Sequence, residues 1–267
     1  MSVSSASIKK VAKGIYKRNT INLTVVTAVI MSVWFIFSNI ASIVQVFTHG
    51  YAYLIIMPLF IILLFLPLFF GFLRYCWRVI SGVADNPIAV FYYFSHHRHY
   101  LKSLRLIITL LVRIVISFFI FYIPVFVLDL ITGTWLYSTL DIAVPMWTTN
   151  LSTISSILSF LATVATIFAS LKLYLAPMLF VADENMDTAE AIHLSAVITK
   201  ITTLDIIFLL SSFSGWFLLS FLSLPILFTL PYFIISYLIH SSYSVGAFNE
   251  RVSNTNYDDI PTFIAGA

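Results

Sequence analysis

The sequence predicts an all-α protein, a polytopic transmembrane helical bundle with about six membrane-spanning helices. The prediction depends on composition, with 60% hydrophobic against 9% charged residues, on a mean hydropathy of +1.01, and on a series of long apolar stretches. Soluble domains carry about 25% charged residues, so this chain needs lipid around it. A stretch of roughly 20 apolar residues crosses about 30 Å of hydrocarbon. Six such stretches take up nearly the whole chain.

These stretches set the expected domain organisation. A basic N-terminal segment, 1–19, precedes one transmembrane domain, 20–248, and a C-terminal tail, 249–267. The predicted spans are 20–47, 51–79, 104–131, 151–181, 203–222 and 224–245. The last two form one apolar run that is too long for a single helix. Pro225, after Ser223 and Leu224, predicts a tight hairpin there, because proline removes a donor and disfavours helix in the residue before it.

The lysines and arginines predict the orientation. With the N-terminus inside, the expected inner segments hold Lys9, Lys10, Lys13, Lys17, Arg18, Arg74, Arg78, Arg98, Lys102, Arg105, Lys200 and Arg251. The expected outer connections, 49–51, 132–150 and the turn at Ser223, contain neither lysine nor arginine. Short cationic loops stay on the cytoplasmic side, so both termini are expected in the cytoplasm. The largest outer loop carries Trp135, Tyr137 and Trp147, whose rings suit the headgroup layer.

Two amphipathic helices are predicted along the cytoplasmic interface, over 87–101 and 187–200. Asn86 before Pro87 is a favourable N-cap with proline at the first helical position. Asp187 followed by Glu190 has the pattern of a capping box, in which each side chain accepts from a backbone N–H of the first turn. Interfacial helices of this kind lay their apolar face in the headgroup boundary.

The two helices also indicate an internal repeat. Each follows a span and an acidic turn that begins Val-Ala-Asp, at 83–85 and at 181–183. Pro67 and Pro177 precede these turns by similar distances. The alternatives are a degenerate 3+3 repeat and a chance match in a biased composition.

Several short segments resemble a bacterial integral membrane family catalogued as domain of unknown function 975. They are Gly71-Phe72-Leu73-Arg74, Phe94-Ser95, Tyr100-Leu101, Tyr174-Leu175-Ala176-Pro177, Ala182-Asp183, Glu190-Ala191, Ser214-Gly215-Trp216, Leu218-Leu219 and Pro231-Tyr232. The resemblance implies the multi-pass helical fold. It implies no catalytic residue, because these are small, aromatic and proline residues of the kind that shape helix packing.

Apart from Arg74, Arg78 and Arg105, which lie near the inner ends of the predicted spans, four charged residues fall inside these spans and are candidate site residues: Arg113, Lys172, Asp129 and Asp205. Such a charge costs roughly 2.5 to 3.5 kcal/mol at a helix centre on insertion scales. They are candidates for a substrate path, and the alternative is that they are structural hydrogen-bonded groups. Lys172 and Asp129 could pair if they lay on opposed helices. Asp205 opens the predicted fifth span, where the macrodipole favours a negative charge.

A basic fringe of His96, His97, Arg98, His99 and Lys102 is a candidate contact for lipid headgroups. Glu190 and His193 lie on one helical face and are weak candidates for a metal, although di-metal bundles need this motif twice with further glutamates. The expectation is no metal. Cys76, the single cysteine, excludes an internal disulfide.

Motif searches for nucleotide, zinc-protease, hydrolase and dinucleotide signatures give no match, so neither an enzyme nor a cofactor is predicted. The cations flank spans, which argues against nucleic acid. The sequence predicts an accessory or scaffold protein of a bacterial cytoplasmic membrane, contacting the bilayer, anionic lipids, and a membrane partner or second copy. The alternative is a small transporter or an export or immunity factor for a peptide, lipid or small solute.

Overall fold

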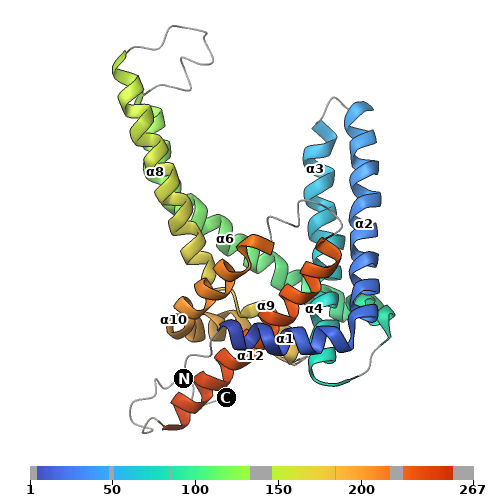
Figure 1. The fold of residues 1–267 in the computed structure, drawn as a ribbon. Helices are drawn as coiled ribbons and strands as arrows, with labels where there is room; N and C mark the ends of the chain where they lie inside the picture. The colour runs from blue at the N-terminus through green and yellow to red at the C-terminus, as the bar shows by residue number, and fades with distance from the viewer. Residues whose placement is uncertain are drawn as a thin grey trace. The chain divides into compact units, whose positions relative to one another are not determined.

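The computed structural model describes residues 5–47, 51–83, 86–132, 146–183, 185–216 and 225–254, and every regular element in these ranges is helical. The elements are α1 (Ser5–Arg18), α2 (Thr20–Phe47), α3 (Tyr51–Phe60), η1 (Ile61–Phe65), α4 (Leu66–Ile80), η2 (Pro87–Phe91), α5 (Tyr92–Ser95), α6 (His97–Thr132), α8 (Met146–Leu171), α9 (Ala176–Ala182), α10 (Thr188–Ser212) and α12 (Ile226–Asn254) (Figure 1). The all-α prediction is confirmed.

The prediction of six spans is also confirmed. Among the described residues, six segments are long and apolar enough to cross a membrane: Thr20–Val46, Tyr53–Ile80, His97–Leu130, Thr153–Ala182, Thr188–Trp216 and Ile226–Glu250. The protein is therefore a multi-pass membrane protein by helix length and hydropathy. The predicted hairpin at Ser223 and Leu224 and the rings of Trp135 and Tyr137 lie outside the described residues.

The two interfacial helices do not form as predicted. The range 87–101 is divided between the 3-10 helix η2, the single turn α5 and the start of α6, with extended backbone at His96 (φ −137°, ψ 135°) between the last two. The range 187–200 is the first half of α10, which runs on to Ser212. No proline or glycine occurs in α10, so nothing ends the helix where the sequence pattern changes.

The predicted helix caps have different outcomes. The Asn86 side chain accepts from the Ile88 N–H at 3.1 Å, which confirms the first cap. Asp187 has the extended backbone of an N-cap (φ −78°, ψ 154°) but makes no side-chain capping bond. The capping-box prediction is therefore wrong. Asp187 is exposed, and water can hydrate its carboxylate.

The chain divides into two units, which are described separately. The first comprises Met1–Ile107 and Leu175–Ala267, and the second Ile108–Tyr174. In the first unit α12 contacts α1, α2, α4 and α10. Its residues Ile235 and Leu238 are fully buried. Helix α12 therefore provides the core on which the other helices of this unit pack.

Helix α1 lies across α12 (Figure 1), whereas the sequence predicted only a basic segment over 1–19. Ile8 and Ala12 are buried, with 1% and 0% exposure, and Ile15 is half-buried. The spacing of four and then three residues places all three on one helical face. The sequence itself contains this spacing, between the lysines of the same segment.

Close packing joins α4 to η2 and α9. Gly71 lies so near η2 that a Cβ built on it would be 1.8 Å from the Val90 carbonyl oxygen. On the same helix Phe70 packs edge-on against Tyr93 and Phe180, with ring centroids 6.5 and 5.9 Å apart. Only a residue without a side chain permits this approach of two backbones.

The second span is interrupted where η1 widens the helix. Pro67 has no N–H, so it cannot donate to the Leu63 carbonyl four residues earlier. The Tyr100 hydroxyl donates to that oxygen at 2.9 Å instead. A side chain from α6 thus replaces the missing backbone bond, as a span in lipid requires.

The fourth span is interrupted more completely. Helix α8 ends at Leu171, a turn follows at 172–175, and α9 begins at Ala176 with Pro177 next. The Leu175 N–H, freed by the turn, donates to the Ser195 hydroxyl at 3.1 Å. Ser195 is fully buried, so this bond satisfies a backbone donor that water does not reach.

In the second unit the rest of α6 and α8 form an antiparallel pair. Tyr122 on α6 pairs with the Thr163 hydroxyl at 2.7 Å, and Asp129 accepts from the Ser155 hydroxyl at 2.6 Å. The exposed positions around these contacts are mainly apolar, among them Ile116, Phe119, Ile120, Ile123 and Phe126. Exposed apolar side chains of this kind are suited to lipid.

Candidate functional site

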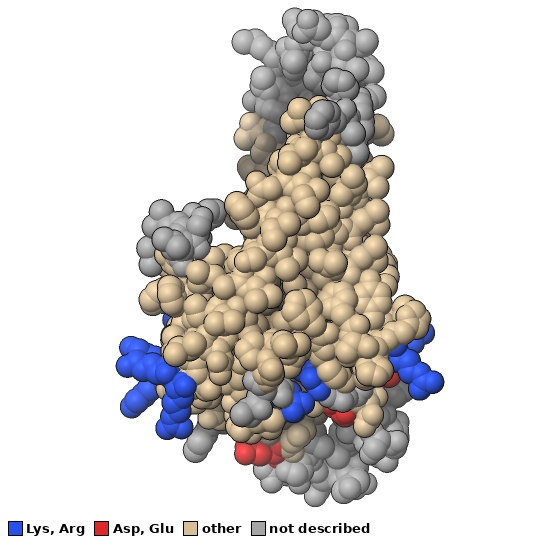
Figure 2. Space-filling model, turned by 90° about the vertical axis from the view of Figure 1, so that its right-hand side faces the viewer, with Lys and Arg blue, Asp and Glu red and all other residues tan. Residues whose placement is uncertain are grey.

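Helix α1 presents cations on the face opposite its buried residues. Lys10, Lys13, Lys17 and Arg18 are exposed. Lysine and arginine side chains are exposed on the face drawn in Figure 2. Exposed cations of this kind are able to meet negative charge at a membrane surface.

Lys9, on the same helix, has a different role. Its ammonium donates to the Ser212 carbonyl at 2.6 Å and lies 4.3 Å from the centroid of the Phe213 ring. Ser212 is the last residue of α10, where the carbonyls lack helical partners and the dipole favours a cation. The Tyr232 hydroxyl of α12 donates to the Lys9 carbonyl at 3.4 Å. These bonds fix α1 to α10 and α12, and burial lowers the pKa of Lys9.

The predicted basic fringe divides into two groups. His96, His97 and Arg98 are exposed. Lys102 is half-buried and holds its ammonium 5.4 Å from the Phe180 ring centroid, and His99 packs on Tyr92 with ring centroids 4.7 Å apart. The first group is exposed, as a headgroup contact requires, whereas the second takes part in aromatic packing.

A buried arginine joins this packing, and sequence reasoning missed it. Arg74 is only 7% exposed, and its guanidinium lies 3.4 Å from the centroid of the Tyr92 ring. The Tyr92 hydroxyl is 3.3 Å from a ring nitrogen of His99. In the sequence Arg74 serves as a topology signal, because no residue spacing predicts that a side chain of α4 contacts a side chain of α5.

Asp129 and Lys172, two charged residues of the second unit, do not form the pair that the sequence offered as one possibility. Asp129 is bonded to Ser155, whereas Lys172 lies seventeen positions further along the chain (172 − 155) in the turn after α8. At 1.5 Å per residue that is about 25 Å along the axis. The pairing of Lys172 with Asp129 is therefore wrong, and Lys172 lies just after the C-terminal end of α8, in the turn that interrupts the fourth span. Arg113 is exposed on α6.

Asp205 lies within α10, seventeen residues after its first residue (205 − 188), and not at a helix N-terminus as predicted. It lines a small cavity of about 30 Å³ together with Thr202 on the same helix and His240 and Ser244 on α12. His240 is 4% exposed. The cavity has room and polar groups for a water molecule. His240 is the one histidine inside a predicted span, and that signal was overlooked.

Glu190 and His193, the weak metal candidates, are both exposed. Within the described ranges, no three His, Cys, Asp or Glu side chains come close enough to hold a metal ion. Zinc and similar ions need three or four such ligands.

Comparisons with known proteins add no relative: no family model, curated protein or solved structure matches this chain. The resemblance to domain of unknown function 975 stays a prediction.

Proposed function

We propose that this protein is a non-enzymatic accessory or scaffold protein of a bacterial cytoplasmic membrane, with both termini in the cytoplasm. It binds anionic lipid through the cationic interface, defined as Lys10, Lys13, Lys17 and Arg18 of α1 with His96, which directly precedes α6, and His97 and Arg98 at the start of α6.

One observation supports this proposal above the others. Helix α1 is held on α12 by Ile8 and Ala12 and tied to the end of α10 by Lys9, while its other cations are exposed. A helix that served only as a topology signal would not need this docking. A cationic helix fixed in place presents its charges to a membrane surface without first having to be ordered.

The test compares anionic with zwitterionic lipid on the full-length protein in mild detergent. Dioctanoyl phosphatidylglycerol is expected to raise the apparent melting temperature more than dioctanoyl phosphatidylcholine at low salt, and the difference is expected to shrink at high salt. The apparent Kd for phosphatidylglycerol is expected to weaken on the order of 100-fold in the triple variant Lys10→Gln, Lys13→Gln, Lys17→Gln, since each cation contributes about 1 kcal/mol to binding.

Arg113→Gln is the matched control, because Arg113 is an exposed arginine outside α1 and outside the start of α6. It is expected to leave the response to phosphatidylglycerol unchanged. An equal response to both lipids, or a triple variant that responds like wild type, contradicts the proposal.

A further inference from the structure

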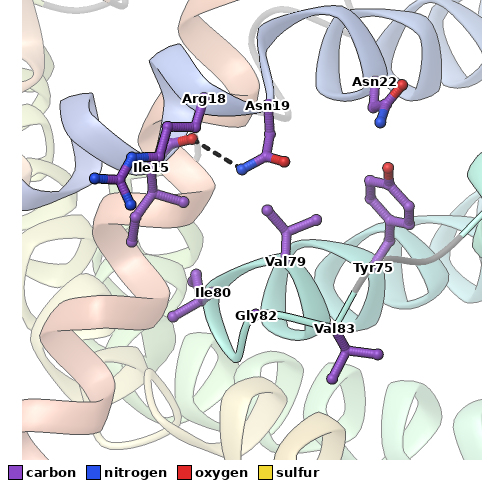
Figure 3. A pocket seen from close by; sticks show the side chains of 9 residues that line it. All are labelled: Ile15, Arg18, Asn19, Asn22, Tyr75, Val79, Ile80, Gly82 and Val83. Carbon is purple, nitrogen blue, oxygen red and sulfur yellow. Dashed lines mark hydrogen bonds between the residues drawn. The ribbon is translucent and has the colours of Figure 1, made fainter.

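A cavity of about 300 Å³ lies in the first unit, between the junction of α1 and α2 and the end of α4. Arg18, Asn19 and Asn22 line it from the junction, and Tyr75 and Val79 line it from α4 (Figure 3). A volume of this size is at the lower end of the range for small-molecule sites.

The turn after α4 builds one wall of the cavity. Gly82 has a φ of +77°, a left-handed backbone conformation that glycine adopts more readily than other residues. The Val83 N–H donates back to the Arg78 carbonyl at 2.9 Å, and the Gly82 N–H to the Val79 carbonyl at 3.2 Å. This C-terminal capping pattern folds the chain back on the helix end and brings Val83 into the lining of the cavity.

The polar lining of the cavity offers hydrogen-bonding side chains and one cation, and it includes no carboxylate. The Asn22 amide and the Tyr75 hydroxyl are turned toward one another in Figure 3, and Tyr75 is otherwise buried, with 1% exposure. Arg18 is exposed; in Figure 3 its guanidinium points away from this pair, and its long side chain can swing onto a bound anion. No aspartate or glutamate is among the lining residues of this described cavity. The chemistry therefore selects an anion, and an arginine with neutral donors suits a phosphate.

The remaining lining suits the rest of a lipid headgroup. The Asn19 amide donates to the Ile15 carbonyl at 3.1 Å, which fixes the side chain and leaves its oxygen free to accept from a hydroxyl. Ile80 and Val83 contribute apolar side chains. Ile80 is the last residue of the second span, so the cavity lies at the level where the apolar stretch of that span ends.

We infer that this cavity binds the phosphate group of an anionic phospholipid, with Arg18, Asn22 and Tyr75 on the phosphate and Asn19 on a headgroup hydroxyl. The inference rests on the proposed function in taking the ligand to be a lipid. It adds one defined site to the diffuse attraction of the lysines of α1.

Native mass spectrometry of the full-length protein in detergent tests the inference. Three probes are compared: dioctanoyl phosphatidylglycerol, dioctanoyl phosphatidylcholine and inorganic phosphate. Wild type is expected to retain one phosphatidylglycerol at concentrations where phosphatidylcholine is not retained. Asn22→Leu and Arg18→Gln are each expected to weaken this binding at least 10-fold.

Asn39→Leu is the matched control. Asn39 lies on α2 like Asn22, but it is exposed, its amide donates to the Phe35 carbonyl at 2.7 Å, and it does not line the cavity. It is expected to bind like wild type. Arg18→Gln alters an exposed side chain, so it keeps the test valid if Asn22→Leu fails to fold.

Each other outcome is decisive. If inorganic phosphate displaces phosphatidylglycerol at equal concentration, the site binds phosphate and the lipid assignment is overturned. If Asn22→Leu and Arg18→Gln bind like wild type, the cavity is not the site. Loss of lipid response only in the triple lysine variant keeps the proposed function and removes this inference. Loss only in Asn22→Leu and Arg18→Gln keeps this inference and removes the lysines from the proposed lipid contact. Asn22→Leu carries this distinction, because Asn22 lines the cavity and lies outside the cationic interface, whereas Arg18 belongs to both.

Discussion

The second and fourth spans are both interrupted beside a proline, yet the interruptions differ. In the second span the chain stays helical through η1, and one carbonyl, that of Leu63, needs an outside donor. In the fourth the helix stops at Leu171 and restarts at Ala176, and one N–H, that of Leu175, needs an outside acceptor. In each span a hydroxyl from a later helix supplies the missing partner.

The difference separates two uses of a proline in a span. The widened turn keeps α3 and α4 in one unit, whereas the turn at 172–175 contains the boundary between the two units. Phe70 and Phe180, each three residues after its proline, pack at 5.9 Å. These shared features are what the predicted repeat needs, and the repeat itself stays a prediction.

The largest expected effect comes from the packing that follows the first interruption. In Gly71→Ala the new Cβ would meet the Val90 carbonyl oxygen at 1.8 Å and its carbon at 2.9 Å. Backbone atoms cannot yield as a flexible side chain does, so α4 and η2 must separate. We expect a loss of about 3 kcal/mol or more in stability. The measurement is the fraction of monodisperse protein remaining after heating in detergent.

Gly246→Ala on α12 is the control for this change, because a Cβ there meets nothing within 4 Å. It is expected to be neutral or to stabilise by up to about 1 kcal/mol, as alanine does in a helix. Equal melting temperatures for the two variants would show that the close approach of α4 to η2 is not needed.

The second interruption is tested by Ser195→Ala. The substitution leaves the buried Leu175 N–H without its acceptor, and an orphaned buried donor costs about 1 to 3 kcal/mol. Limited proteolysis and thermal unfolding in detergent measure the loss. Ser42→Ala is the comparison, since Ser42 is exposed and donates only to the Ser38 carbonyl. A Ser195→Ala variant as stable as Ser42→Ala would mean that the turn is satisfied in another way.

The first interruption is tested by a double-mutant cycle. Tyr100→Phe removes the donor to the Leu63 carbonyl and is expected to cost about 1 kcal/mol. Pro67→Ala restores the N–H that proline lacks, so in that background Tyr100→Phe is expected to cost less. Thermal unfolding of the four proteins gives the coupling energy. Additive effects would show that the tyrosine does not replace the proline's missing bond.

The sequence predicted the spans well because hydropathy depends only on the residues of each segment. It also showed Pro67 and Pro177 at similar distances before the two Val-Ala-Asp turns, and each proline lies beside an interruption. It did not predict how α1 docks, because Lys9 and Ser212 are 203 residues apart in sequence. Hydropathy gives the length of each helix and leaves open which faces meet.

The site residues show the same limit. Asp205 was noted as a charge in a span, but its neighbour His240 on α12 was not, since only packing brings α10 and α12 to one cavity. Arg74 was counted for topology, and its stacking on Tyr92 depends on a turn whose direction the sequence leaves open. Asp129 and Asp205 stand out in the sequence as charges inside spans, but Ser155, which donates to Asp129, and His240, which lines one cavity with Asp205, each lie on another helix.

The smallest expected effect concerns Lys9 at the C-terminal end of α10. This is the helix whose Ser195 accepts from the Leu175 N–H in the second interruption. Burial lowers the pKa of Lys9 below its usual 10.5. The unfolded chain therefore keeps the Lys9 proton to a higher pH than the folded protein does. Between the pKa of the folded state and 10.5, the free energy of unfolding contributed by Lys9 consequently rises with pH. Lys9→Met lacks this contribution. Thermal unfolding of wild type and Lys9→Met is measured from about pH 7 upward. The stability difference, wild type minus variant, is expected to increase as the pH approaches 10.5. A constant or falling difference would mean that the ammonium is not desolvated against Phe213.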